Sequence, residues 1–141
     1  MVELVVVMVV IGIVAVVAMP KWSDRTSFDS RGFADQTLAS LRYAQKSAIS
    51  QRRTVCATFN ANSVTLTIAS AAGALACNTN LASPSGPSPY SVTANAGVAY
   101  SPTPTNFQFN SLGQASIGQT MSVSGASGTI TVEQDTGYVH P

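Results

Sequence analysis

The sequence predicts an α+β protein in which one long N-terminal helix packs on an antiparallel β-sheet domain. Three observations support this prediction: an apolar run near the start, helical apolar spacing in the charged segment after it, and period-two alternation from residue 54 onward. The chain has 141 residues, enough for one compact domain with a modest core. We divide it into residues 1–20, residues 21–53 and residues 54–141.

The first segment is dominated by an apolar run from Leu4 to Met19, sixteen residues without a charge or a hydrogen-bonding side chain. As a helix it would span about 24 Å, slightly less than the roughly 30 Å of a bilayer core. A cleaved secretory signal would need a basic segment before the run and a small-residue cleavage site after it, and neither is present. A small domain could hardly surround so uniformly apolar a helix. We therefore expect it to lie in a membrane or in the core of an assembly.

The second segment carries all seven Lys and Arg of the chain against three Asp. Its apolar residues recur at a spacing of three to four, which is typical of an amphipathic helix. These residues are Phe28, Ala34, Leu38, Leu41, Ala48 and Ile49. We predict one helix from about residue 2 to residue 51, bent near Pro20, with the last four of these residues facing a sheet.

The third segment alternates apolar and polar residues, as half-buried strands do. Val55–Phe59 and Val64–Ile68 flank Asn60-Ala61-Asn62, which predicts a β-hairpin. Proline-rich stretches at residues 83–89 and 101–104 predict loops. Further strand candidates are Tyr90–Thr93, Val98–Tyr100, Asn106–Phe109, Met121–Ser124, Thr129–Glu133 and Gly137–Val139.

Residues 54–132 contain no Asp, Glu, Lys, Arg or His. General acid/base chemistry, coordination of hard metal ions and neutralisation of phosphate all need such side chains. We therefore propose no catalytic residue and no cofactor. A membrane-anchored enzyme would require Asp35 to converge with the C-terminal tail.

The N-terminal residues Val2 to Ile13, which read VELVVVMVVIGI, resemble the first helix of type IV pilins and type II secretion pseudopilins. Pro20 falls where many of those helices carry a proline. The resemblance implies that Glu3 is the family's glutamate at the fifth mature position, which approaches the amino terminus of a neighbouring subunit in the filament core. A buried carboxylate needs such a partner. The alternative is a glutamate exposed to lipid headgroups at the membrane interface, without a role in assembly.

The resemblance also concerns what precedes the first residue. In that family a basic leader ends in Gly and is followed by Phe-Thr-Leu; a peptidase cuts after the Gly, and the new amino terminus is methylated. If Met1 stands at the place of that Leu, two further residues precede it in the mature protein. We therefore expect an internal start or a trimmed sequence, with in-frame Gly-Phe-Thr codons upstream of the Met1 codon.

The C-terminal half is similar to the GspH/FimT domain, on three stretches of sequence. These are Phe107–Gly113, Ile130–Glu133 and Thr136–Val139. Together with Arg42–Ile49 and Gln51–Arg53, they resemble in particular the minor pilins of mannose-sensitive haemagglutinin (MSHA) type systems.

The resemblance also bears on the two cysteines, Cys56 and Cys77. They have no metal-ligand spacing and no neighbouring His that would activate a thiol. The orientation of a pilin places this domain outside the cytoplasm, where a disulfide is the expected state. It would close a loop of about 20 residues and contribute about 3 kcal/mol in the chain-entropy model. Two free buried thiols are the alternative.

Basic residues on the second segment raise the hypothesis of nucleic-acid binding. They are Arg42, Lys46, Arg52 and Arg53. Cations near the end of a helix are more simply solvated charges or partners of its dipole. FimT-like pilins implicated in DNA uptake carry a Gly-Arg-x-Arg tail, whereas this chain has Gly137-Tyr138-Val139-His140. Tyr138 could stack on a base and His140 could carry a charge in its protonated form, but neither replaces permanent cations. We therefore do not expect nucleic acid as a partner.

These inferences predict a structural minor pilin or pseudopilin of the GspH type. It would be a single-pass protein of the bacterial inner membrane, with its C-terminal domain in the periplasm, until it is extracted into a pilus or pseudopilus. Its partners would be other subunits and the inner-membrane assembly platform, and it would help to initiate or cap the filament. The rival is a pilus-tip receptor for DNA or a surface glycan, with recognition by loop residues around Tyr90, Tyr100 and Asn106.

Overall fold

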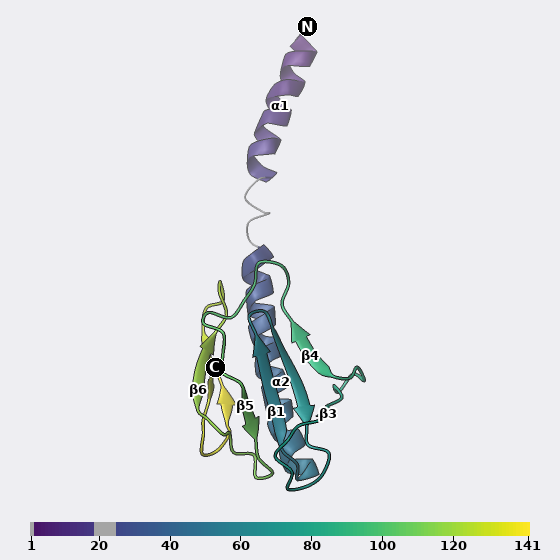
Figure 1. Cartoon of the computed structure of the whole chain (residues 1–141). Coiled ribbons are helices and arrows are strands. Elements are labelled where there is room, and N and C mark those ends of the chain that lie inside the picture. Colours follow the sequence, from purple (N-terminus) through teal and green to yellow (C-terminus); the bar gives the residue numbers. More distant parts are fainter. Residues whose placement is uncertain (1, 19–24) are drawn as a thin grey trace.

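The computed structural model describes residues 2–18 and 25–141 (Figure 1). Helix α1 covers Val2–Ala18 and helix α2 covers Arg25–Gln51. The helix predicted from residue 2 to residue 51 is therefore present as two described helices. The bend expected near Pro20 lies outside the described residues. The α+β class is confirmed, because antiparallel sheets follow the helices along the chain.

A five-stranded antiparallel sheet forms one part of the domain behind α1, which we call the body (residues 25–141). Its strands are β1 (Val55–Asn60), β2 (Ser63–Ile68), β3 (Thr79–Asn80), β4 (Tyr90–Thr93) and β5 (Phe107–Phe109). The order is β3-β2-β1-β5, and β4 also pairs with β2. β4 extends the edge of β2 along residues 63–66, and β3 extends the same edge along residues 67–68.

A second, three-stranded sheet has the order β6-β7-β8. Its strands are β6 (Gln119–Ser122), β7 (Thr129–Val132) and β8 (Val139–His140). Isolated bridges join Tyr100 to Val123 and Phe109 to Ala115, and so tie the two sheets together. Helix α2 lies along both sheets and packs against β1, β4 and β8 (Figure 1).

Most of the predicted strands are present, but two regions differ from the prediction. Val98–Tyr100 forms no strand, because the chain turns at Gly97, whose φ is +86°, and only Tyr100 pairs, in an isolated bridge. β3 is short and polar, so no alternation marks it in the sequence. It pairs with β2 just after Cys77, which the disulfide to Cys56 holds beside the hairpin.

The buried face of α2 differs from the predicted apolar face. Phe28 is 72 % exposed and Ile49 is 48 % exposed, although Leu41 and Ala48 are buried as predicted. Small hydroxyl residues complete the buried face, which consists of Ser30, Phe33, Thr37, Ser40, Leu41, Ala44, Ser47 and Ala48. Their hydroxyls bond to nearby carbonyl oxygens, as Ser40 does to Thr37, so that burying them leaves no polar group unpaired.

Tyr100 joins α2 to the five-stranded sheet at the centre of the core. The Thr37 hydroxyl donates to the Phe33 carbonyl at 2.8 Å, so the Tyr100 hydroxyl is the donor in its 2.9 Å bond to Thr37. The Tyr100 ring lies 4.9 Å from that of Phe33 and 5.7 Å from that of Phe59. Burial raises the pKa of Tyr100 to about 12. Tyr100 is thus a core residue and offers no face to a ligand, contrary to its expected role in the receptor hypothesis.

Candidate assembly surface

Helix α1 exposes apolar side chains on all sides. The exposed fractions of its large apolar residues from Val2 to Val16 lie between 53 % and 78 %. In Figure 1 the helix extends away from the body. The exposed fractions show that the body does not cover the large apolar residues from Val2 to Val16. So much exposed apolar surface marks an interaction surface rather than a core element.

The length of α1 bears on how it would meet a membrane. Within residues 2–18 and 25–141, no helix combines the length and hydropathy needed to cross a membrane.

Glu3 lies in the first turn of α1 and is exposed. A carboxylate there suits the positive end of the helix dipole. The described residues provide it with no ion-pair partner.

Helix α2 also has an uncovered face, which we call the exposed stripe. Its residues are Phe28, Arg31, Asp35, Ala39, Arg42, Lys46 and Ile49, and all seven are exposed. At 3.6 residues per turn they lie within an arc of about 80°. The stripe is apolar at its two ends, acidic at Asp35 and basic at Arg31, Arg42 and Lys46.

Two polar residues of α2 hold the turns of the body. The Arg42 Nε donates to the Val139 carbonyl at 2.9 Å. The Gln45 amide donates to the carbonyls of Gly113 at 3.1 Å and Thr136 at 2.9 Å. Arg42, a candidate phosphate contact in the sequence, thus has a structural bond. Gln45 was not singled out, since nothing in the sequence around a polar helix residue shows which distant carbonyls it will meet.

The basic end of α2 closes with a Schellman motif. The Arg52 amide donates to the Ile49 carbonyl, and the Arg53 amide donates to the Ala48 carbonyl. Arg52 has a φ of 52° at the position that usually holds glycine. Arg52 and Arg53 therefore lie beyond the last turn, whereas Lys46 remains on the exposed stripe.

The C-terminal tail pairs its own polar groups. The His140 ring stacks on the Tyr138 ring at 5.3 Å, and His140 Nε2 lies 3.3 Å from a carboxylate oxygen of Glu133. The tail thus brings a carboxylate to the residues considered for contact with DNA. This arrangement opposes binding of a phosphate backbone.

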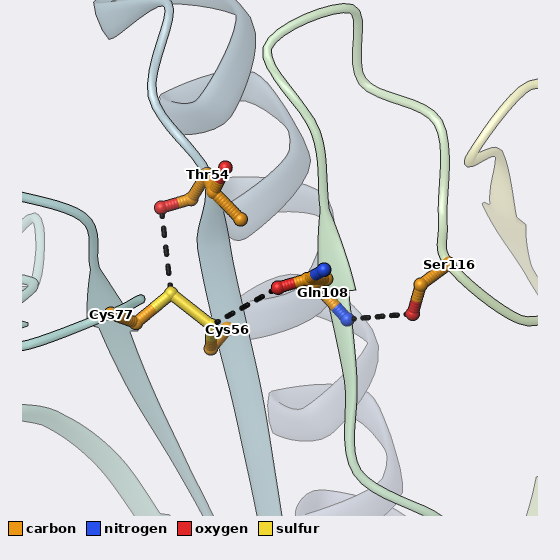
Figure 2. Close-up of a disulfide and its surroundings, with 5 residues drawn as sticks. All are labelled: Thr54, Cys56, Cys77, Gln108 and Ser116. Carbon is orange, nitrogen blue, oxygen red and sulfur yellow. Dashed lines mark hydrogen bonds between the residues drawn. A yellow bond between two sulfur atoms is a disulfide. The ribbon is translucent and has the colours of Figure 1, made fainter. Parts of the chain in front are cut away.

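The predicted disulfide between Cys56 and Cys77 is present (Figure 2). One sulfur lies 3.6 Å from the Thr54 carbonyl oxygen and the other 3.7 Å from the side-chain oxygen of Gln108. Because a disulfide sulfur carries no proton, both are polar contacts without donation. Beside Cys56, the outer face of β1 and β5 forms a shallow uncharged groove of about 320 Å³ that also includes Thr58 and Asn106.

The described residues offer no obvious centre for chemistry. They contain no group of three or more His, Cys, Asp or Glu that could hold a metal ion. Among these residues an ion-pair contact joins His140 to Glu133. The surfaces that stand out are α1 and the exposed stripe of α2, which are suited to contacts between chains.

A helix that extends from an α+β body with antiparallel sheets gives this protein a pilin-like fold. The chain matches the family model for the type II transport protein GspH over residues 33–139. Because this match covers more than half of the chain, the protein belongs to the GspH family. Searches of curated proteins and of solved structures found no significant match. The family match covers most of α2 and nearly all of the sheets, and α1 lies outside it.

Proposed function

We propose that this protein is a structural minor pilin or pseudopilin, held in the bacterial inner membrane by its N-terminal segment and then built into a filament. Its body would lie in the periplasm, and its partners would be other subunits and the assembly platform. The observation that carries the proposal is the combination of a GspH body with a helix whose large apolar residues from Val2 to Val16 are uncovered. A role in initiating or capping the filament, and the MSHA type of system, follow from the sequence resemblance and stay predictions.

The exposed surface of α1 explains why such a protein needs both a membrane and partners. Burying apolar surface stabilises by about 25 cal/mol per Å². Lipid can cover α1 before assembly, and the helices of neighbouring subunits can cover it afterwards. The described residues of the body do not cover α1, so the cover must be lipid or another subunit.

We expect Glu3 to determine how subunits are arranged when α1 passes from lipid into the filament. A carboxylate that enters a packed helical core needs an ionic partner, and without one it is strongly destabilising. We propose that the amino terminus of a neighbouring subunit is this partner. The charge would then favour one arrangement of subunits over others that leave Glu3 unpaired.

The body suits a structural role better than binding of DNA or a glycan. Its surface between residues 54 and 132 carries no charged side chain, so that it can be buried against other subunits without leaving ions unpaired. Tyr100 is buried, and the half-buried Tyr90 packs on Tyr43 with ring centres 5.6 Å apart. The aromatic residues expected to recognise a glycan are thus occupied within the core and along α2.

The test compares Glu3→Leu with Glu133→Leu, which removes another exposed carboxylate. Both full-length variants are expressed in cells that lack the native gene, and each is quantified in the membrane fraction and in sheared filaments. Glu3→Leu should remain in the membrane and fall about tenfold in filaments, which corresponds to roughly 1.4 kcal/mol. Glu133→Leu should enter filaments normally. Normal incorporation of Glu3→Leu would refute the role of the glutamate, and absence of the unmodified chain from every filament would refute the proposed function.

A further inference from the structure

A groove lies between α2 and the turn that joins β6 to β7. Its volume is about 320 Å³, at the lower end of the range for sites that bind small ligands. Ser127 and Thr129 add hydroxyl groups to it, and Pro141, which follows β8, also lines it. Its apolar lining residues are Ala34, Leu38, Ala126 and Ile130. The groove thus combines apolar walls with polar groups on one side.

The edge of β7 is open beside this groove. β8 pairs with β7 along residues 131–132, and the Glu133 N–H donates to the Tyr138 carbonyl on the same side. Main-chain hydrogen bonds point to alternate sides along an antiparallel strand, so the N–H and C=O of Thr129 face the β8 side, as those of Glu133 do. β8 ends at His140, and no described strand pairs with Thr129 on that side. The Thr129 main chain can therefore bond to an added polypeptide.

β8 determines where such a polypeptide can begin. β8, the yellow arrow in Figure 1, runs antiparallel to β7, and Pro141 continues its line to the level of Ile130. A strand that is added in line with β8 and pairs with Thr129 must therefore start directly after this level. It also runs antiparallel to β7, as β8 does. A polypeptide that starts there has a free α-ammonium group.

The same contacts give the position of Pro141 along α2. Gln45 bonds to the Thr136 carbonyl, and Arg42, three residues earlier, bonds to the Val139 carbonyl, three residues later. β8 and α2 therefore run in opposite directions. From Val139 to Pro141 the strand rises by about 7 Å, which equals about five residues of helix. Pro141 thus lies about five residues before Arg42 on α2.

Two opposite charges follow along the groove from that level. Asp35 comes first, and Arg31 lies one turn further on. Neither forms an ion pair within the described residues, although charges four residues apart on a helix often pair. An α-ammonium group that bonds to the Thr129 carbonyl would lie beside Asp35. The groove therefore suits a chain that begins with its positive charge at the blocked end.

The pleat of the added strand determines which of its side chains meets Arg31. Ile130 is buried and Thr129 is exposed, and side chains alternate between the two faces of a sheet. The first added residue, opposite Thr129, would point its side chain to solvent. The second, opposite Gly128, would point towards α2, and nothing lies within 4 Å of the place where a Cβ of Gly128 would be. An acidic second residue fits the guanidinium group of Arg31.

We infer that this groove binds the free amino terminus of a partner polypeptide, extended beside Thr129, with its ammonium group at Asp35 and an acidic second residue at Arg31. An internal segment does not fit, because Pro141 occupies the line that it would continue along. Asp35 does meet the C-terminal tail here, as an enzyme would require. The other charged side chain that lines the groove is a guanidinium, which suits binding better than acid/base chemistry. The inference does not depend on the proposed function.

A short peptide is the probe for this site. Ala-Glu-Ala-Gly-Ser, with a free amino terminus and a fluorophore at its carboxyl end, is titrated with the full-length chain in detergent micelles at neutral pH, and binding is followed by fluorescence anisotropy. The same peptide with an acetylated amino terminus should bind at least about tenfold more weakly, because it has lost the ammonium group. Ala-Lys-Ala-Gly-Ser should be weaker by a similar factor. Equal binding of the acetylated peptide, or no saturable binding of the free peptide below about 1 mM, overturns the inference.

Variants of the chain locate the two charged contacts. Asp35→Asn should weaken binding of the free peptide about tenfold and leave the acetylated peptide unaffected. Arg31→Gln should weaken Ala-Glu-Ala-Gly-Ser by a similar factor, with little effect on Ala-Ala-Ala-Gly-Ser. Asp135→Asn and Arg25→Gln, which remove exposed charges outside the groove, are the matched controls and should change neither affinity. Equal losses in the controls would assign binding to overall charge and overturn the site.

A lysine side chain is the alternative occupant, since its ammonium group could also reach Asp35. Acetyl-Gly-Lys-Gly-Glu-Gly, with the same fluorophore, presents such a side chain without a free amino terminus. It should bind at least about tenfold more weakly than Ala-Glu-Ala-Gly-Ser. Equal affinity would assign the groove to a lysine side chain and overturn recognition of a chain end.

Discussion

The N-terminal helix and the body treat apolar side chains in opposite ways. Every large apolar residue described in α1 is more than half exposed, whereas Leu41, Leu66 and Phe109 are completely buried in the body. The body also pairs its polar groups, since every buried side-chain nitrogen and oxygen among the described residues has a hydrogen-bond partner. The body therefore completes its own interior, and α1 requires surroundings from outside the chain.

Because of this difference, substitutions in the two regions should change different measured properties. Substitutions in the body should change its free energy of unfolding. Substitutions in α1 should change where the chain resides and what it joins, with little effect on unfolding of the body. The following predictions test that separation in the full-length chain in detergent micelles, with urea unfolding followed by circular dichroism.

The largest effect is expected where the turn at Gly137 contacts the turn at Gly113. Gly137 has a φ of +64°, and a Cβ there would overlap the carbonyl oxygen of Gly113, which also accepts from Gln45. Gly137→Ala should destabilise the body by about 4 kcal/mol, from the backbone strain and the clash together. Gly73→Ala is the control, because Gly73 has a φ of +83° but open space around it, and should cost only about 1 kcal/mol. Equal losses would mean that the contact between the turns contributes little.

The disulfide should have the next largest effect. The variant with both Cys56→Ala and Cys77→Ala frees a loop with a sequence separation of 21. The body should lose about 3 kcal/mol of stability, mainly because the unfolded chain gains entropy. The same loss should appear when the unmodified chain is unfolded with a reductant, and a reductant should not affect the variant. A variant as stable as the unmodified chain would show that the strands alone hold this edge.

Alkaline pH should weaken the body through Tyr100. Burial raises the pKa of Tyr100 from 10.0 to about 12 in the folded state, so the folded chain holds this proton more tightly than the unfolded chain. Its contribution is complete below pH 10 and falls by about 1.4 kcal/mol per pH unit as the pH rises towards 12. Tyr100→Phe removes the ionisable group and should show a correspondingly smaller decline between pH 10 and pH 12. Identical declines would assign the effect to other groups.

The smallest effect is expected in α1. Val9→Ala removes two methyl groups from a side chain that is 55 % exposed, and should change the unfolding free energy of the body by less than about 0.5 kcal/mol. Val64→Ala, the same substitution at a buried position of β2, should cost about 2 kcal/mol. Similar losses for the two variants would break the separation between the regions.

Local patterns in the sequence predict much of this fold. Period two identifies β1, β2 and β4, because one face of each strand meets the core and the next residue meets solvent. The two cysteines, together with the location outside the cytoplasm that the resemblance implies, predict the disulfide. The predicted apolar face of α2 is partly wrong, since buried hydroxyl residues replace Phe28 and Ile49 there. Hydroxyls can be buried when a carbonyl lies within reach, and apolar spacing carries no information about that.

The candidate surfaces, like the fold, could be predicted from the sequence only in part. The sequence by itself determined the uncovered α1, the position of Glu3 and the uncharged stretch of residues 54–132, because these depend only on residue types along the chain. Only the tertiary structure decided that Arg42 and Gln45 bond to distant turns, that Tyr100 is a core residue, and that Asp35 and Lys46 share an uncovered face. The physical reason is that hydrogen-bond partners and exposure depend on which distant segments are brought together by folding, and a local pattern of residues does not contain that information.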